Sequence, residues 1–174
     1  MIEVEVRSFI TKEEYNRLLN FFKSKSSSSK EDYQETFYFD SEQDLRIQRN
    51  NFFSKIWMKK GKIHDDAREE IEIQFKKEDF EELERLFLAL GYNVKIKWFR
   101  TRNEFEWDGI KVCVDYTRGY GYIVEFEKMS DEASKEKDFI FLKEKLESLG
   151  IKISPKEEFE SKFQYYKENW KRLV

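Results

Sequence analysis

The sequence predicts an α+β fold in which about eight antiparallel strands are flanked by four helices. Eight short segments alternate between apolar and polar residues, which is the period of a strand. Four further segments repeat every three to four residues and carry helix-capping signals. The chain has 174 residues, 39% of them hydrophobic and 17% aromatic, which favours one sizeable core. We therefore expect a single domain over residues 1–174.

The chain begins with a predicted strand that has one apolar face and one charged face. In residues 2–9 the apolar side chains alternate with Glu3, Glu5 and Arg7. Thr11 then provides an N-cap, and the apolar stripe behind it predicts a helix. A strand followed directly by a helix is the expected start of the fold.

The serine-rich stretch from Lys23 to Asp32 is polar and of low complexity, so it predicts a flexible surface loop. Residues 61–66 are also expected to form a loop, and the only histidine, His64, is an ordinary surface residue in this interpretation. Four strand-like segments lie around these breaks, at residues 33–40, 44–50, 53–60 and 68–76.

The second half of the chain repeats the same kinds of element. Residues 78–90 have helical periodicity that stops at Gly91. Two glycine-containing breaks, Asp108-Gly109 and Gly119 to Gly121, suit hairpins. The three strands of this predicted meander are residues 94–107, 110–117 and 121–128, and the two closing helices are residues 131–149 and 157–170. Aromatic residues on the last helix, including Phe159, are spaced to pack as one face.

Composition excludes several classes of protein. The 33 Lys and Arg residues nearly balance 36 Asp and Glu residues, for a net charge of -3, so no global basic field would attract nucleic acid. Cys113 is the single cysteine, which excludes an intrachain disulfide and a multi-cysteine zinc site. The N-terminus carries charges where a signal peptide would be apolar, and no stretch reaches the length of a membrane span. We expect a soluble, cytoplasmic protein without membrane or nucleic-acid partners.

In several strands, the polar half of the alternation consists of acids and bases instead of Ser, Thr or Asn. An antiparallel sheet with one face in water would explain any one such strand. Closure into a barrel would instead remove the edge strands and enclose the charges. Periodicity alone leaves both arrangements open. The charged residues in phase on their strands are Glu3, Glu5, Arg7, Arg46, Lys55, Lys59, Arg68, Glu70, Glu72, Arg100, Arg102, Glu104, Glu125 and Glu127.

The chemistry of these residues favours a site for a metal and a phosphate. Clustered carboxylates supply the hard oxygen ligands that Mg²⁺ or Mn²⁺ prefers. Clustered Arg and Lys suit a triphosphate, whose oxygens guanidinium groups bind in a bidentate manner. Bases alone would indicate simple anion binding and acids alone a metal store, so the mixture indicates metal–phosphate chemistry.

Several segments, in order, resemble the CYTH domain or triphosphate tunnel metalloenzyme superfamily, which includes class IV adenylyl cyclases and thiamine triphosphatases. MIEVEVRSF resembles the E-x-E-x-K signature, TFYFD and LRIQR resemble the next two motifs, and KIWMKKG, REEIEI and VCVDYTRGYGYIVEFE complete the series. The likeness extends from Met1 to about Lys128. It implies a closed eight-stranded antiparallel β-barrel, the triphosphate tunnel, with a bound triphosphate and a divalent metal, Mg²⁺ or Mn²⁺.

The resemblance also implies roles for individual residues. Arg7 replaces the signature lysine, so it would still bind phosphate but not act as a general base. Gln48 stands where a second arginine is usual. The implied metal ligands are Glu3, Glu5, Glu72, Asp115, Glu125 and Glu127, with Glu70 as a weaker candidate. The implied substrate-binding residues are Arg7, Arg46, Lys59, Arg68, Arg100 and Arg102, and the catalytic set is Glu5, Glu127 and Arg7.

Three functions remain open at this point. The first is a metal-dependent triphosphatase in which water attacks the terminal phosphorus of inorganic, nucleoside or thiamine triphosphate. The second is a class IV adenylyl cyclase that makes cyclic AMP and pyrophosphate from ATP, although the sequence contains no adenine-reading motif. The third is a non-catalytic binder of triphosphate or polyphosphate. In each case the partner is a small-molecule triphosphate, and the protein is expected to be a monomer or homodimer.

Overall fold

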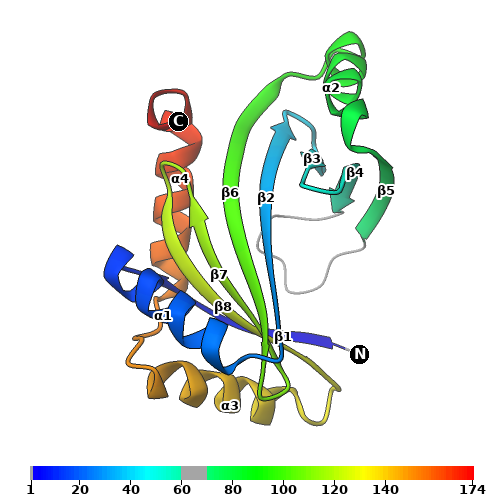
Figure 1. The fold of residues 1–174 in the computed structure, drawn as a ribbon. Coiled ribbons are helices and arrows are strands. Elements are labelled where there is room, and N and C mark those ends of the chain that lie inside the picture. The colour runs from blue at the N-terminus through cyan, green and yellow to red at the C-terminus, as the bar shows by residue number, and fades with distance from the viewer. Residues whose placement is uncertain (1, 60–69) are drawn as a thin grey trace. The chain divides into compact units, whose positions relative to one another are not determined.

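We describe the protein from a computed structural model, which describes residues 2–59 and 70–174. These residues form eight strands, four α-helices and one short 3-10 helix, which confirms the predicted elements. Figure 1 labels the eight strands and the α-helices along the chain. The strands are β1 (Ile2–Ile10), β2 (Ser28–Phe39), β3 (Asp44–Arg49), β4 (Phe53–Lys59), β5 (Glu70–Lys76), β6 (Val94–Trp107), β7 (Ile110–Thr117) and β8 (Gly121–Ser130). The helices are α1 (Lys12–Lys25), η1 (Lys77–Asp79), α2 (Phe80–Ala89), α3 (Lys135–Ser148) and α4 (Lys156–Leu173).

The eight strands form one sheet in the order β1-β8-β7-β6-β2-β3-β4-β5. Among the described residues β1 pairs with β8 alone and β5 with β4 alone, so the sheet has two open edges. The predicted closure into a β-barrel is therefore wrong. Alternation could not decide this point, because it requires only that one face of each strand packs on an apolar core, and an open sheet satisfies that requirement equally well.

The chain divides into two compact units, and the first comprises Met1–Glu31, Thr101–Glu168 and Leu173. In this unit α1 and α3 pack on one face of the strands β1, β7 and β8 (Figure 1). Its core includes Leu18 and Phe22 of α1 and Leu142 and Leu146 of α3, all fully buried. The charged side chains of β1 alternate with the residues that enter this core, so they lie on the opposite face of the strand.

The second unit comprises Asp32–Arg100, Asn169–Arg172 and Val174. In it α2 packs on β3 and β4. Four fully or nearly buried side chains, Phe37, Ile47, Phe80 and Phe87, form the centre of its core. Each unit thus buries one face of its strands against helices.

Local signals placed several element ends correctly. Thr11 Oγ1 accepts a hydrogen bond from the Glu14 N–H at 3.1 Å, and the Glu14 carboxylate accepts one from the Thr11 N–H at 2.7 Å. Gly91 follows α2 with a φ of 92°. Asp108 and Gly109 have φ values of 51° and 71° between β6 and β7, which is the left-handed conformation that a tight hairpin requires.

The predicted loop from Lys23 to Asp32 is wrong. Helix α1 continues to Lys25, and β2 begins at Ser28. The Ser27 N–H donates to the Glu106 carbonyl oxygen at 3.0 Å, which starts the pairing of this segment with β6. Backbone groups of a serine-rich segment pair as well as any others, so the partner strand overrides the low intrinsic strand preference.

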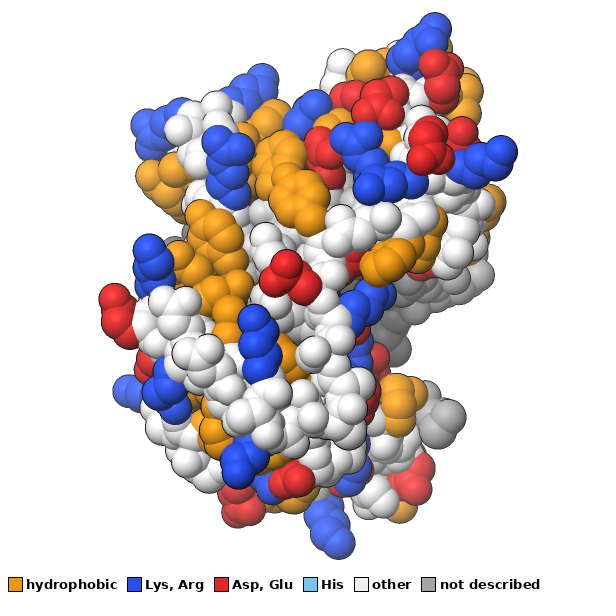
Figure 2. All heavy atoms as spheres, in the orientation of Figure 1, with side chains coloured by type: hydrophobic (Ala, Val, Ile, Leu, Met, Phe, Trp, Pro, Cys, Tyr) orange, Lys and Arg blue, Asp and Glu red, His pale blue; other side chains and the backbone are white. Residues whose placement is uncertain are grey.

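Acidic and basic side chains are mixed on the surface of the described residues. On the face seen in Figure 2, acidic and basic side chains are interspersed, with apolar side chains between them. None of the helices in the described part of the chain is both long enough and apolar enough to cross a membrane.

Candidate active site

Three carboxylates of the first unit converge where β1 pairs with β8. Glu5 lies directly opposite Glu127 in the antiparallel register, and Glu3 precedes Glu5 on the same face of β1. One carboxylate oxygen from each of these three residues lies within 4.8 Å of the others. The alternation predicted the face, and the register brings together residues far apart in the sequence.

The pKa of Glu5 shows that nearby cations balance little of the negative charge of this carboxylate cluster. Burial, followed by the negative charge of Glu125 and a hydrogen bond with it, raises the pKa of Glu5 to about 8. Arg7 opposes the change only weakly, since its guanidinium lies 3.7 Å from the Glu5 carboxylate. The Glu5 side chain keeps 41% of its surface exposed, so water moderates the effect.

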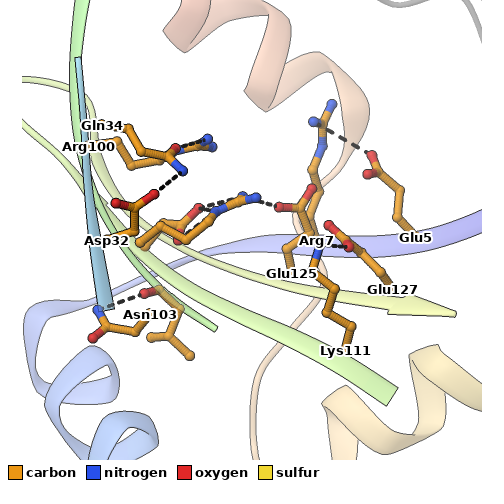
Figure 3. A network of polar contacts seen from close by, with 12 residues as sticks. Glu5, Arg7, Asp32, Gln34, Arg100, Asn103, Lys111, Glu125 and Glu127 are labelled. Carbon is orange, nitrogen blue, oxygen red and sulfur yellow. Dashed lines mark hydrogen bonds and ion pairs between the residues drawn. The ribbon is translucent and has the colours of Figure 1, made fainter. Parts of the chain in front are cut away.

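The Glu127 side chain is more buried than that of Glu5, and a neighbouring cation balances more of its negative charge. Lys111 Nζ donates to its carboxylate at 2.7 Å, and only 9% of the Glu127 side chain is exposed. Burial and the charge of Glu125 raise the pKa of Glu127, and the bond from Lys111 lowers it. Figure 3 shows Lys111 reaching Glu127 from β7. Lys111 was missed by the sequence analysis, although it is in phase with Cys113 and Asp115 on its strand.

A buried arginine lies between two further carboxylates of the same unit. Arg102 of β6 donates to Asp115 of β7 at 2.7 Å and to Glu125 of β8 at 2.8 Å. All three side chains are at most 13% exposed. Burial alone would lower the pKa of Arg102, but the charges of Asp115 and Glu125 raise it well above its usual value. This arginine stays charged and fixed in orientation.

Cys113 also lies within this charged group. Its thiol sulfur lies within 4.8 Å of one carboxylate oxygen each of Glu125 and Glu127. Burial raises the pKa of the Cys113 thiol, so it stays protonated, and a protonated thiol is a poor metal ligand. Cys113 is completely buried, which is consistent with a packing role for this side chain.

In the second unit, several residues predicted to bind substrate or metal contact other protein side chains. Arg46 binds Asp44 through two hydrogen bonds of 2.6 and 2.5 Å, and its guanidinium lies over the rings of Tyr38 and Trp57 at 4.3 and 4.6 Å. Arg46 is 8% exposed and Asp44 is 9% exposed. Both hydrogen bonds use the Nε and Nη2 edge of Arg46, so Asp44 would have to be released before that edge could bind phosphate.

Arg100 belongs to a polar chain that the sequence analysis did not anticipate. Its Nε and Nη2 donate to Gln34 Oε1 at 2.9 and 2.5 Å. Gln34 Nε2 in turn donates to Asp32 at 3.1 Å, and Asp32 accepts a third bond from the Asn51 N–H at 3.0 Å. Figure 3 shows the Arg100, Gln34 and Asp32 side chains that form this series of hydrogen bonds. Because the Asp32 carboxylate accepts only donors, it orients the Gln34 amide with its oxygen toward Arg100.

Glu72 is paired with a base in the second unit. Lys55 Nζ donates to its carboxylate at 2.7 Å and Gln74 donates at 3.0 Å. Burial would raise the pKa of Glu72, but these two bonds lower it. Of the remaining predictions, Arg68 and His64 lie outside the described residues, and Lys59 and Glu70 are described only as strand positions on β4 and β5.

The carboxylate cluster fits a divalent metal. Its donors are hard oxygens from three residues, and burial together with the charge of Glu125 raises the pKa of Glu5, an effect that a bound cation would oppose. Glu3, Glu5 and Glu127 are therefore the residues suited to hold Mg²⁺ or Mn²⁺, with Glu125 alongside. Arg102 and Arg7 present cations beside them in the same unit, where a polyanion could bind.

Comparison with known proteins gives a consistent result. The CYTH domain model matches residues 1–163. A Methanocaldococcus jannaschii protein named "Putative adenylate cyclase" is 29% identical over 163 residues, which cover 87% of this chain and 91% of the relative. The structure of a conserved hypothetical protein from Pyrococcus furiosus is 27% identical with a TM-score of 0.64, covering 86% of this chain and 91% of that one. A Hippeastrum protein is similar in fold, at 17% identity and a TM-score of 0.62 over 86% of this chain and 89% of that one.

Proposed function

The chain belongs to the CYTH domain family, and from this premise we propose that it is a divalent-metal-dependent enzyme that hydrolyses a triphosphate. The observation that carries the proposal is the convergence of acids and bases in the first unit. Glu3, Glu5 and Glu127 gather within 4.8 Å, and Arg102 is held by Asp115 and Glu125 next to them along β8. Acids alone would leave the phosphate unbound, and bases alone would need no metal.

The residues of this chain would divide the work between them. Glu3, Glu5 and Glu127 would hold Mg²⁺ or Mn²⁺, which supplies charge neutralisation to phosphate oxygens when bound. Asp115 and Glu125 hold Arg102 at Nε and Nη2, so its Nη1 would be the group that meets a phosphate oxygen without reorganisation. Arg7 would add a second cation. Lys111 holds the Glu127 carboxylate in place and opposes the rise of its pKa, so this carboxylate would be oriented to accept a metal.

We favour hydrolysis over cyclisation because hydrolysis requires fewer specific contacts between the protein and the nucleoside part of the substrate. A cyclase must place the ribose 3′-hydroxyl against the α-phosphorus, and no adenine-reading group has been identified in this chain. The M. jannaschii relative carries the name "Putative adenylate cyclase", whereas the Hippeastrum protein of similar fold is described as a "Putative adenylyl cyclase" that reveals a dominant triphosphatase activity. Cyclic AMP synthesis from ATP is therefore the second candidate for this chain.

A non-catalytic binder is the third candidate, and the acidic cluster argues against it. Three carboxylates near a polyanion weaken its binding unless a metal lies between them. Metal dependence separates the two possibilities, because a binder should keep its affinity for triphosphate in chelator, whereas an enzyme should lose its turnover.

A turnover assay tests the proposal. The purified protein is given inorganic triphosphate, ATP or thiamine triphosphate with Mg²⁺, with Mn²⁺ or with chelator, and orthophosphate, pyrophosphate and cyclic AMP are followed separately. Metal-dependent release of orthophosphate is the expected result. Pyrophosphate formed together with cyclic AMP would establish the cyclase, and triphosphate binding without any product would establish the binder.

A further inference from the structure

Two aromatic rings and two cations form a stack that joins β1 to α4 in the first unit. The Arg7 guanidinium carbon lies 4.6 Å from the centre of the Phe159 ring. Phe159 stacks on Phe9, with ring centres 4.3 Å apart and ring planes inclined by 26°. Lys162 Nζ lies 3.8 Å from the centre of the Phe9 ring. Figure 3 shows the end of the Arg7 side chain beside this helix.

The ring is held much more firmly than the guanidinium that lies on it. Phe159 is 6% exposed, and its neighbour Phe9 also contacts Tyr120, with ring centres 5.4 Å apart. The Arg7 side chain is 38% exposed, and its ion pair with Glu5 is long at 3.7 Å. A long side chain in that position loses considerable rotamer freedom when it binds a ligand, and a fixed aromatic platform reduces that loss in advance.

We propose that Phe159 is a positioning residue, which holds the Arg7 guanidinium in the orientation that binds phosphate oxygens, so that α4 takes part in substrate binding. This inference rests on the proposed function, since it assumes that Arg7 contacts a triphosphate. Phe159 itself makes no contact with phosphate in this account. It acts only through Arg7.

The same contact accounts for an arginine where the family signature has a lysine. A guanidinium is planar and delocalised, so it can lie on a ring and still direct the N–H groups at its edge toward an anion. An ammonium group has no such face and is more strongly hydrated. Arg7 and Phe159 therefore form a functional pair, in which the benefit of the ring depends on the guanidinium.

The test is a double-mutant cycle on the full chain, with Phe159→Leu and Arg7→Lys alone and combined. The apparent Kd for inorganic triphosphate is measured by calorimetry with Mg²⁺. Phe159→Leu should weaken binding about fivefold in the Arg7 protein, as expected for the loss of one cation–π contact. In the Arg7→Lys background the same substitution should change the Kd less than twofold. Phe159→Trp, which keeps an aromatic face, should restore most of the affinity.

Two controls separate positioning from a general effect on folding. Phe139→Leu makes the same substitution at a residue of α3 that is 47% exposed, and it should leave the Kd unchanged. The NMR shift of the Arg7 Nε–H, without substrate, should lose its ring-current displacement in Phe159→Leu and keep one in Phe159→Trp. This second readout does not depend on activity.

An equal fold-loss from Phe159→Leu in both backgrounds would overturn the inference, because a purely structural role acts regardless of residue 7. An unchanged Arg7 shift in Phe159→Leu would overturn it too. Arg102→Ala distinguishes this failure from failure of the proposed function. If the unaltered protein does not bind triphosphate, or if Arg102→Ala binds it as well as the unaltered protein does, the triphosphate site itself is wrong and the role of the pair is refuted with it.

Discussion

Replacing Glu5 by glutamine should stabilise the metal-free protein at high pH. Burial and the nearby charge of Glu125 raise the pKa of Glu5 from 4.5 to about 8. An acid whose folded-state pKa is raised contributes stability below its unfolded pKa, and this stability is lost as the pH rises through the folded value. Glutamine cannot ionise, so the variant avoids the loss. The difference between the two proteins should therefore grow between pH 4.5 and pH 8.

The size of the effect follows from the pKa and the exposure of the side chain. The full change from 4.5 to about 8 would correspond to roughly 5 kcal/mol, at ~1.4 kcal/mol per pH unit. Water reaches 41% of the Glu5 side chain, so screening removes most of that amount. We expect Glu5→Gln to be about 1–2 kcal/mol more stable than the unaltered protein at pH 9 and about equal to it at pH 5.

Urea unfolding at both pH values, in chelator, measures this difference. Glu3→Gln removes the same charge from the same face of β1 and controls for net charge, and it should give a smaller gain. Added Mg²⁺ should reverse the order at pH 9, because the unaltered protein keeps the full ligand set. A stability difference that is the same at pH 5 and pH 9, or a variant that is less stable at pH 9, would refute the account of the acidic cluster.

Three further predictions concern the same unit. Mn²⁺ should bind more tightly as the pH rises toward 8 and should release protons on binding, because the pKa of Glu5 is about 8 before the metal binds. Calorimetry in buffers of different ionisation enthalpy measures both effects. An affinity that does not change with pH would contradict the assignment of Glu5 as a metal ligand. Arg102→Ala should raise the KM for triphosphate at least tenfold, and it should lower the free energy of unfolding by about 3 kcal/mol, since Asp115 and Glu125 lose their buried partner. An unchanged KM would refute the proposed phosphate site. Gly119→Ala should lower the free energy of unfolding by about 2 kcal/mol, because φ is 74° there and the new Cβ would lie 2.6 Å from Leu173 Cβ, and thermal unfolding tests this.

Local signals were sufficient wherever the determining interactions lie close together in the chain. The capping box of Thr11, the stop at Gly91 and the turn at Asp108-Gly109 were all predicted, because each depends on backbone geometry within a few residues. The faces of β1 and β8 were predicted for a similar reason, since successive side chains of a strand point to opposite sides. The serine-rich segment failed because its conformation depends on a strand 79 positions away, where Ser27 bonds to Glu106.

The sequence by itself determined the element order, the charged faces and the residue types of the proposed metal–phosphate site. It could not determine closure of the sheet, because an open and a closed sheet bury the same apolar side chains. Only the tertiary structure decided which side chains contact one another. Cross-strand register places Glu5 opposite Glu127, and packing of α4 brings Phe159 onto Arg7, while Arg46 is held by Asp44. Such pairings depend on distances across the sheet, and alternation along one strand carries no information about them.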